Sequence, residues 1–116
     1  MKRFTAILMA AMISLFISCE EENQPQEPFF KLQEISAEVP AQGGELKVVV
    51  LTNVEYQYDN TSDWIKDVEV KEGKNTFTHV YQVEPNETEK SRTAVLTFCA
   101  NKQCMAFTVT QASAQL

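Results

Sequence analysis

Short runs in which apolar and polar residues alternate recur along this chain from Phe29 onward. They come about every eight to twelve residues and are separated by turn-forming residues, which is typical of a sandwich or barrel of short antiparallel strands. No segment shows helical periodicity over a useful length. The pattern therefore predicts an all-β domain of about seven strands with a two-layer core. The expected strands are residues 30–39, 45–52, 54–59, 64–70, 76–83, 91–99 and 104–111.

The last two runs predict a β-hairpin with a defined register. If Asn101 and Lys102 form a two-residue turn, the numbers of facing residues sum to 203. This register sets Cys99 opposite Cys104 on one face of the hairpin, because side chains alternate sides along a strand. The apolar pairs expected on the other face are Leu96 with Phe107, Phe98 with Met105, and Ala94 with Val109.

The run at residues 45–52 is the most apolar. Leu46, Val48 and Val50 share one face, and Val49 and Leu51 add apolar side chains to the other. A strand that is apolar on both faces suits a central position in a sheet. The connections expected between strands are residues 43–44, 60–63, 71–75 and 85–90.

Residues 1–18 predict a signal peptide. Lys2 and Arg3 precede a 14-residue apolar run that ends at Ile17, too short for a membrane-spanning helix. Ser18 followed by Cys19 resembles the bacterial lipoprotein box, in which the cysteine becomes the lipidated first residue of the mature chain. The alternative is an ordinary signal peptide followed by a chance cysteine.

Residues 19–28 predict an acidic, flexible tether, since they hold two prolines and, apart from Cys19, no apolar side chain. Their run of three glutamates, residues 20–22, resembles that of surface-exported lipoproteins of the Bacteroidetes; a generic solvated linker is the alternative. Removal of residues 1–18 takes away two basic residues, leaving eight Lys and Arg against 16 Asp and Glu, a net charge of −8. Nucleic acid is therefore not an expected partner.

The remaining cysteines, Cys99 and Cys104, predict a disulfide, because export places them in an oxidising compartment and the hairpin register sets them side by side. Two free thiols are the alternative. Half of a metal site is a weaker one, since the chain has only one histidine, His79, and no second cysteine pair.

Several short motifs follow one another between residues 35 and 111. They are Gly43-Gly44, Thr52-Asn53, Tyr56-Gln57-Tyr58, Trp64-Ile65, Pro85-Asn86, Arg92-Thr93-Ala94 and Val109-Thr110-Gln111. Their order resembles the BACON domain, which implies an immunoglobulin-like β-sandwich of exported or cell-surface proteins, often attached to glycan-degrading enzymes. For that family, carbohydrate binding and a spacer role are both discussed. Tyr56 stands where the family often has Trp, and we expect the domain to span residues 29–113.

Catalysis is not expected, because the chain has no Gly-rich phosphate loop and no Ser or Cys beside a plausible base. His79 shares a strand face with Phe77 and Tyr81, which indicates a packed histidine. Oxygen atoms of residues 59, 60 and 63 could hold calcium, but their spacing favours a solvated turn. We therefore expect no cofactor and no metal.

Sugar binding normally needs exposed aromatic rings surrounded by amides and carboxylates. The alternative for the aromatic residues here is ordinary core packing, which we favour for Trp64. Two or more coplanar rings on one open surface would favour sugar binding, and buried rings would favour packing. The candidates are Tyr56, Tyr58, Trp64 and Tyr81.

Two functions remain open. The first is a lipoprotein, anchored to the outer membrane through Cys19 and exposed at the surface, that captures polysaccharide or mucin-type glycans beside surface glycan-utilisation proteins. The second is a non-catalytic structural or protein-interaction module, a spacer or accessory subunit, that presents strand edges to a partner.

Overall fold

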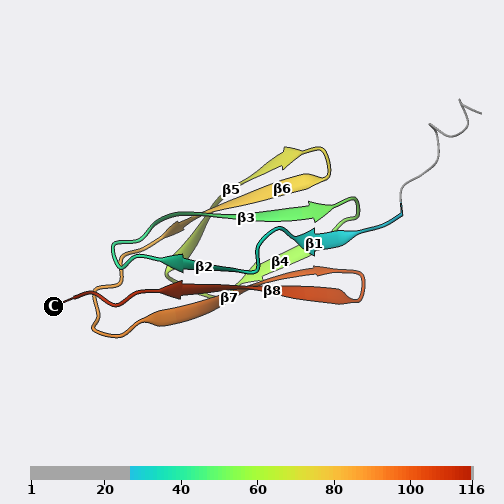
Figure 1. Cartoon of the computed structure of the whole chain (residues 1–116). Coiled ribbons are helices and arrows are strands. Elements are labelled where there is room, and N and C mark those ends of the chain that lie inside the picture. Colours follow the sequence, from blue (N-terminus) through green and yellow to red (C-terminus); the bar gives the residue numbers. More distant parts are fainter. Residues whose placement is uncertain (1–26, 116) are drawn as a thin grey trace, which may run out of the picture.

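The computed structural model describes residues 27–115 as two four-stranded β-sheets packed face to face, with no helix in that range (Figure 1). The first sheet has the strand order β1-β3-β6-β5 and the second β2-β8-β7-β4, the division of strands found in immunoglobulin-like domains. The predicted all-β sandwich is confirmed. The strands are β1 (Phe30–Leu32), β2 (Ser36–Val39), β3 (Gly44–Thr52), β4 (Gln57–Asn60), β5 (Ile65–Gly73), β6 (Thr76–Val83), β7 (Arg92–Ala100) and β8 (Gln103–Gln111).

The single strand expected at residues 30–39 is wrong, because the chain changes sheets within it. β1 pairs antiparallel with β3, whereas β2 pairs parallel with β8, so the sandwich is not wholly antiparallel. The crossing remains hydrogen-bonded to both sheets. The backbone N–H of Gln33 donates to the carbonyl of Val49 on β3, and the backbone N–H of Thr108 on β8 donates to the carbonyl of Ile35. The alternation shifts its phase at two adjacent polar residues, Gln33 and Glu34: the apolar positions are 30 and 32 before them and 35, 37 and 39 after them. The crossing coincides with this shift, which the prediction of a single strand ignored.

The core lies between the sheets. Leu46, Val48 and Val50 on β3 point into it as predicted, and β3 lies inside its sheet between β1 and β6. From the second sheet, Leu96, Phe98 and Phe107 are almost wholly buried. Each fully buried apolar side chain of this size stabilises the fold by about 1.5–3 kcal/mol, so both sheets contribute to one continuous core.

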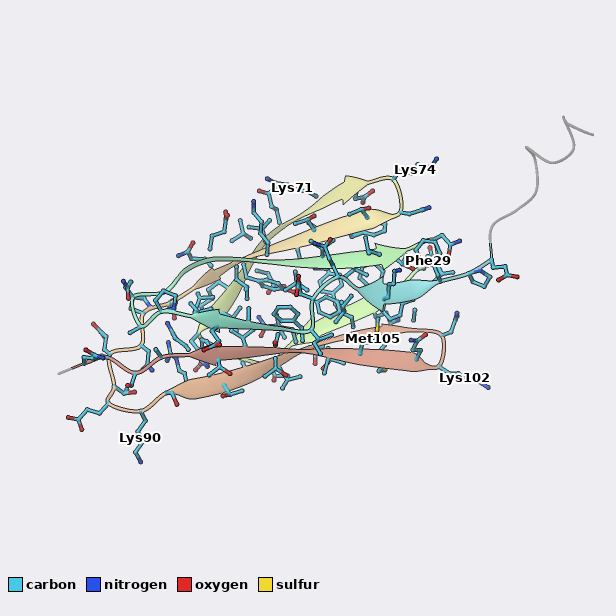
Figure 2. The ribbon with its side chains drawn as sticks, in the orientation of Figure 1. Phe29, Lys71, Lys74, Lys90, Lys102 and Met105 are labelled. Atoms are coloured by element: carbon cyan, nitrogen blue, oxygen red, sulfur yellow. A yellow bond between two sulfur atoms is a disulfide. The ribbon has the colours of Figure 1, made fainter. Side chains whose placement is uncertain are left out.

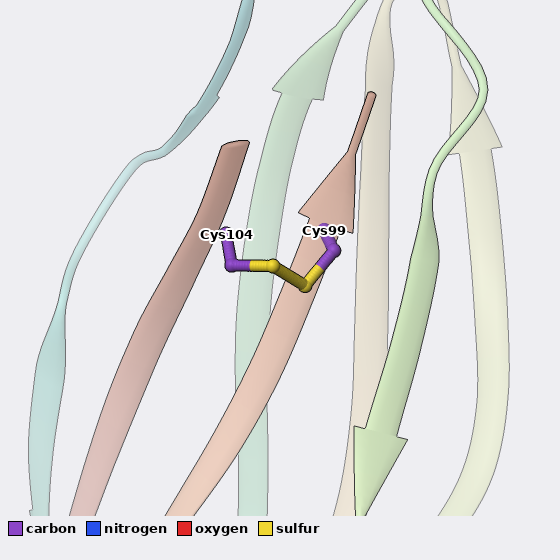
Figure 3. Close-up of a disulfide and its surroundings, with 2 residues drawn as sticks. All are labelled: Cys99 and Cys104. Atoms are coloured by element: carbon purple, nitrogen blue, oxygen red, sulfur yellow. A yellow bond between two sulfur atoms is a disulfide. The ribbon is translucent and has the colours of Figure 1, made fainter. Parts of the chain in front are cut away.

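The β7–β8 hairpin has the predicted register. Leu96 faces Phe107, Phe98 faces Met105, and Ala94 faces Val109. Cys99 faces Cys104 with Cα atoms 4.0 Å apart, and the two form a disulfide on the outer face of the second sheet (Figure 3). The predicted pairing is confirmed.

The β5–β6 hairpin is longer than expected. β5 continues to Gly73, so the connection shrinks from residues 71–75 to a two-residue turn at Lys74 and Asn75, where Asn75 adopts a positive φ of 55°. A bulge at residues 67–69 breaks the alternation of β5, and all of its residues after Ile65 are exposed. Lys71 and Glu72 are charged and Gly73 is typical of turns, which is why these three residues were predicted to belong to the connection and not to the strand.

The described residues contain no helix long and apolar enough to cross a membrane. The predicted signal peptide, Cys19 and the tether up to residue 26 lie outside the described residues.

Candidate functional site

A cleft opens along one side of the sandwich, where β4 and β5 form the last strands of the two sheets. β4 has only four residues and β5 has nine, so β4 covers only part of the inner face that β5 and β6 present. The resulting cavity of about 910 Å³ is lined by the β3–β4 connection, β4, the ends of β5 and β6, and the β7–β8 turn. A smaller cavity of about 200 Å³ continues along β5 and β6. We call the two cavities together the cleft.

Strand register decides which side chains face the cleft. Tyr58 lies opposite Phe98 across the β4–β7 pair, so both point inward. On β5, Asp67 faces Tyr81, Val70 faces His79 and Glu72 faces Phe77, and cross-strand partners share a face of the sheet. Carboxylates and aromatic rings therefore meet in this space.

Tyr56 is the centre of the aromatic cluster. Its ring centroid lies 5.8 Å from Phe30, 6.0 Å from Tyr58 and 5.4 Å from Phe77. Its hydroxyl lies 2.7 Å from Nε2 of His79, a hydrogen bond whose donor depends on the histidine tautomer. Burial, followed by Tyr58 and Glu72, raises the pKa of Tyr56 to about 12, so the phenol stays protonated.

His79 is buried beneath this cluster. Burial lowers its pKa below the ordinary 6.5, and nearby Asp67 only partly opposes that shift. The imidazole is therefore neutral near pH 7 and holds Tyr56 in place. Burial and then Asp67 raise the pKa of Tyr81, which packs parallel to the histidine ring at 6.3 Å.

Tyr58 is the aromatic side chain that reaches solvent in the cleft. It is 48% exposed, and its ring stands edge-on to His79 with centroids 4.5 Å apart. The Tyr56 and Tyr58 rings are inclined by 45°, so they do not form a flat platform. The arrangement expected for sugar binding, two coplanar rings on one open surface, is therefore not found in the cleft, which has one exposed ring supported by a half-buried one.

The other two candidates lie elsewhere. Tyr81 is only 2% exposed and belongs to the core behind the cleft. Trp64 lies just before β5, at the opposite end of the sandwich, half-buried against the core with the guanidinium of Arg92 4.4 Å from its ring centroid. The structure therefore brings Tyr56 and Tyr58 together and separates Trp64 from them.

Sequence reasoning missed Glu72 and Asp67 as neighbours of these rings. Period-two alternation would have grouped them if the bulge in β5 had been known. His79 and Phe77 were recognised as sharing a face with Tyr81, but nothing in the sequence placed that face against Tyr56.

The loop considered for calcium is held by its own asparagine. Asn60 donates its side-chain amide to the carbonyl of Ile65 at 2.7 Å and to Asp67 at 3.1 Å, and its Oδ1 accepts the backbone N–H of Ser62. Within residues 27–115 no three His, Cys, Asp or Glu side chains are grouped to hold a metal.

The opposite end of the sandwich carries a network of polar groups that we call the closed end, defined by Gly43, Trp64, Asn86, Arg92 and Gln111. The buried Gln111 amide donates to the carbonyls of Pro40, Ala41 and Glu84, and its Oε1 accepts Nε–H of Arg92 at 2.8 Å. Arg92 also donates to Glu84 and Pro85. Two connections, β2–β3 and β6–β7, are thus fastened to the end of β8.

Asn86 fastens the β6–β7 connection in the same way. Its buried Nδ2 donates to the carbonyls of Lys90 and Ala112, and its Oδ1 accepts from Thr88. Gly43 has a φ of 78°, and a Cβ there would overlap the carbonyl oxygen of Val83. Only glycine fits this close approach.

Comparisons with known proteins agree with this architecture. In structure the chain is similar to the GH5 xyloglucanase of Bacteroides ovatus, solved in complex with an XXXG heptasaccharide, with a TM-score of 0.63 and 22% identity. The similarity covers 75% of this chain but 19% of the xyloglucanase, so the chain spans about a fifth of that enzyme. An NMR structure of a protein from Bacteroides thetaiotaomicron is 18% identical over 81% of this chain and 94% of its own, with a TM-score of 0.49. No curated protein sequence matches the chain.

A family model matches residues 34–112: BACON, described as "Putative binding domain, N-terminal". Most of the motifs that carry the resemblance meet at the closed end, where they hold connections together, and no catalytic domain is evident in the described residues beside this one. The match covers more than half of the chain, and the chain therefore belongs to the BACON family.

Proposed function

We propose that this protein is a non-catalytic carbohydrate-binding module that holds a glycan in the cleft, against the exposed ring of Tyr58. The half-exposed Tyr58 ring, fixed edge-on by His79 inside a cavity of about 910 Å³, is the observation that carries the proposal. Ligand sites usually combine aromatic walls with a few placed polar groups in a cavity of this size. The apolar face of a sugar ring packs on such a side chain.

Polar groups around Tyr58 suit a polyhydroxylated ligand. Glu55 and Glu72 line the cavity and offer carboxylate acceptors to sugar hydroxyls. Tyr56 keeps its proton at physiological pH and is fixed by His79, which makes the wall rigid before a ligand arrives. A rigid wall lowers the entropy cost of binding.

The similarity to part of a xyloglucanase supports the same class of function. That protein is a xyloglucanase solved with a bound heptasaccharide, and a sandwich like this one occupies a small part of it. We extend this association to the present chain: it captures or positions glycans for partner enzymes and transporters.

Affinity electrophoresis of the purified protein in gels containing xyloglucan, mannan or mucin tests the proposal. We expect retardation by at least one polymer, and Tyr58→Ala should weaken it about tenfold, the equivalent of about 1.4 kcal/mol. Val95→Ala is the matched control, because Val95 is 47% exposed on β7 and lines neither cavity. Tyr58→Phe should bind almost as well as the unchanged protein.

Migration unchanged by every polymer would reject carbohydrate binding. Equal losses in the Tyr58→Ala and Val95→Ala variants would reject the cleft as the site. Circular dichroism of both variants guards against an effect of misfolding.

We further propose that Cys19 carries lipid and anchors the protein at the outer-membrane surface. Eight residue steps separate Cys19 from Glu27, a reach of at most about 29 Å. Glu27 and Phe29 bond to Asn53 at the end of β3, beside the cleft, so an anchored chain would keep the cleft near the membrane. Cys19→Ser should abolish incorporation of labelled palmitate and release the protein from the membrane fraction; unchanged labelling would contradict the anchor.

A protein-interaction role is the second candidate, favoured by the outer edge of β5. In the described residues β5 pairs only with β6, and its Val68 is 56% exposed. Exposed edges accept a further strand. Val68→Lys should then release a partner that copurifies with the unchanged protein, whereas Tyr58→Ala should not; release by Tyr58→Ala alone would contradict edge pairing.

A further inference from the structure

The cleft is a trench rather than a dead-end pocket. Its larger and smaller cavities share Tyr58 and Val70, so the exposed ring lies where the two meet. Along β5 the lining runs from Asp67 to Glu72, a span of about 15 Å. A ligand centred on Tyr58 can therefore extend in both directions, as an internal stretch of a chain does.

The charge of the trench has a single sign. Glu55 and Glu72 line the larger cavity, Asp67 and Glu69 line the smaller one, and no Lys or Arg lines either of them. Lysines near this end of the molecule, Lys71, Lys74 and Lys102, point away from the sandwich into solvent (Figure 2). The carboxylates along the trench repel an anion that lies between them, and no Lys or Arg lines the trench beside them.

From these two features we propose that the cleft selects uncharged glycan chains, binds them at internal positions across Tyr58, and rejects carboxylated or sulfated glycans. The inference rests on the proposed function and narrows its substrate class. Acidic mucin-type or uronate-rich chains are excluded, because each charge would face carboxylates without a compensating guanidinium or ammonium group. Neutral hydroxyls, in contrast, donate hydrogen bonds to those same carboxylates.

Pairs of polymers that share a backbone and differ in charge test the proposal: hydroxyethyl cellulose against carboxymethyl cellulose, and dextran against dextran sulfate. Affinity electrophoresis of the full protein at about 150 mM salt should show retardation by a neutral member and at least tenfold weaker retardation by its anionic partner. The double variant Glu55→Gln/Glu72→Gln should reduce the ratio of neutral to anionic retardation, because amides remove the repulsion while keeping hydrogen-bonding groups. Glu34→Gln/Glu38→Gln is the matched control, since these residues line neither cavity.

Chain-internal binding is tested with cello-oligosaccharides of increasing length and with the long polymer. We expect the affinity to rise with the length of the oligosaccharide. The polymer has far fewer chain ends for the same number of sugar units, yet it should bind at least as well per sugar unit as the longest oligosaccharide. Stronger binding of short oligosaccharides would show recognition of chain ends and would overturn this part.

The outcomes separate the two proposals. Equal binding of neutral and anionic partners, or preference for the anionic one, would overturn charge selection and leave carbohydrate binding standing. A ratio unchanged by Glu55→Gln/Glu72→Gln would also overturn it. No retardation by any neutral or anionic polymer would reject carbohydrate binding and this inference with it.

Discussion

The closed end and the cleft differ in what their polar side chains contact. At the closed end, the amides of Gln111 and Asn86 bond to backbone carbonyls of distant connections. At the cleft, the carboxylates of Glu55 and Glu72 face solvent beside the half-exposed Tyr58. No buried side-chain N or O atom in the described residues lacks a partner, so unused hydrogen-bonding capacity is found only near the surface.

This difference explains why the motifs at the closed end are a poor guide to binding. A buried amide that serves three carbonyls cannot be replaced without leaving them unpaired, so such residues define a fold. The cleft imposes few such constraints, since its lining is mostly side chains at strand ends and edges. Changes at the closed end should therefore cost stability, and changes at the cleft should cost binding.

The largest effect should come from Gly43→Ala. The new Cβ would overlap the carbonyl oxygen of Val83, and the positive φ is unfavourable for alanine. We expect the free energy of unfolding to fall by roughly 3 kcal/mol, measured by urea denaturation. Gly73→Ala is the control, because a Cβ there meets only ordinary contacts; equal losses in the two variants would contradict the close approach at Gly43.

Gln111→Ala should have the second-largest effect and lower the free energy of unfolding by about 2–3 kcal/mol. It leaves the carbonyls of Pro40, Ala41 and Glu84 without the amide donor and removes the acceptor of Arg92. Gln82→Ala, on the exposed face of β6, should change stability little. A Gln111→Ala variant as stable as Gln82→Ala would show that the network does not hold the closed end.

Replacing both Cys99 and Cys104 with serine should lower the free energy of unfolding by about 2 kcal/mol. The effect is small because the disulfide closes a short loop. Non-reducing mass spectrometry of the exported protein should first show the pair two protons lighter than thiols. Equal unfolding midpoints for the unchanged protein with and without reductant would contradict a stabilising disulfide.

Tyr58→Ala should lower the free energy of unfolding by only about 1 kcal/mol, since half of the ring already contacts water. The same variant should lose most glycan affinity, so stability and binding separate at this residue. A stability loss as large as that of Gln111→Ala would place Tyr58 in the framework instead.

The smallest effect concerns pH. Burial lowers the pKa of His79, so the unfolded chain takes up a proton first as the pH falls below about 6.5. The stability that the neutral, buried His79 contributes is fully present above that pH and is lost as the pH falls through the lower pKa that His79 has in the folded protein. Urea denaturation between pH 8 and pH 5 should show a shallower pH dependence for His79→Gln; parallel curves would contradict the assignment.

Much of the fold could be predicted from the sequence because the signals are local. The alternation in residues 91–111 and a two-residue turn suffice to set the β7–β8 register, and with it the Cys99–Cys104 disulfide. The buried face of β3 followed from the same period of two. The split of residues 30–39 into β1 and β2 has only one local sign, the phase shift of the alternation at Gln33 and Glu34, and such a shift does not distinguish a bulge within one strand from a change of sheet.

The candidate site could be predicted only in part. Tyr56 and Tyr58 were chosen as aromatic residues and do lie together, but Trp64, chosen for the same reason, lies at the closed end under Arg92. Glu72 was not foreseen because it was expected in the connection at residues 71–75, and Asp67 was not foreseen because the bulge in β5 shifts which side chains face inward.

By itself, then, the sequence determined most of the strands, the β7–β8 register and the disulfide, because adjacent residues and a short turn fix which side chains face each other. Only the tertiary structure decided that β4 and β5 end their sheets on the same side and leave the cleft between them. It also decided that Gly43, Asn86 and Gln111, far apart along the chain, meet at one end. Both depend on how two sheets are packed, which the period of two along a single strand does not encode.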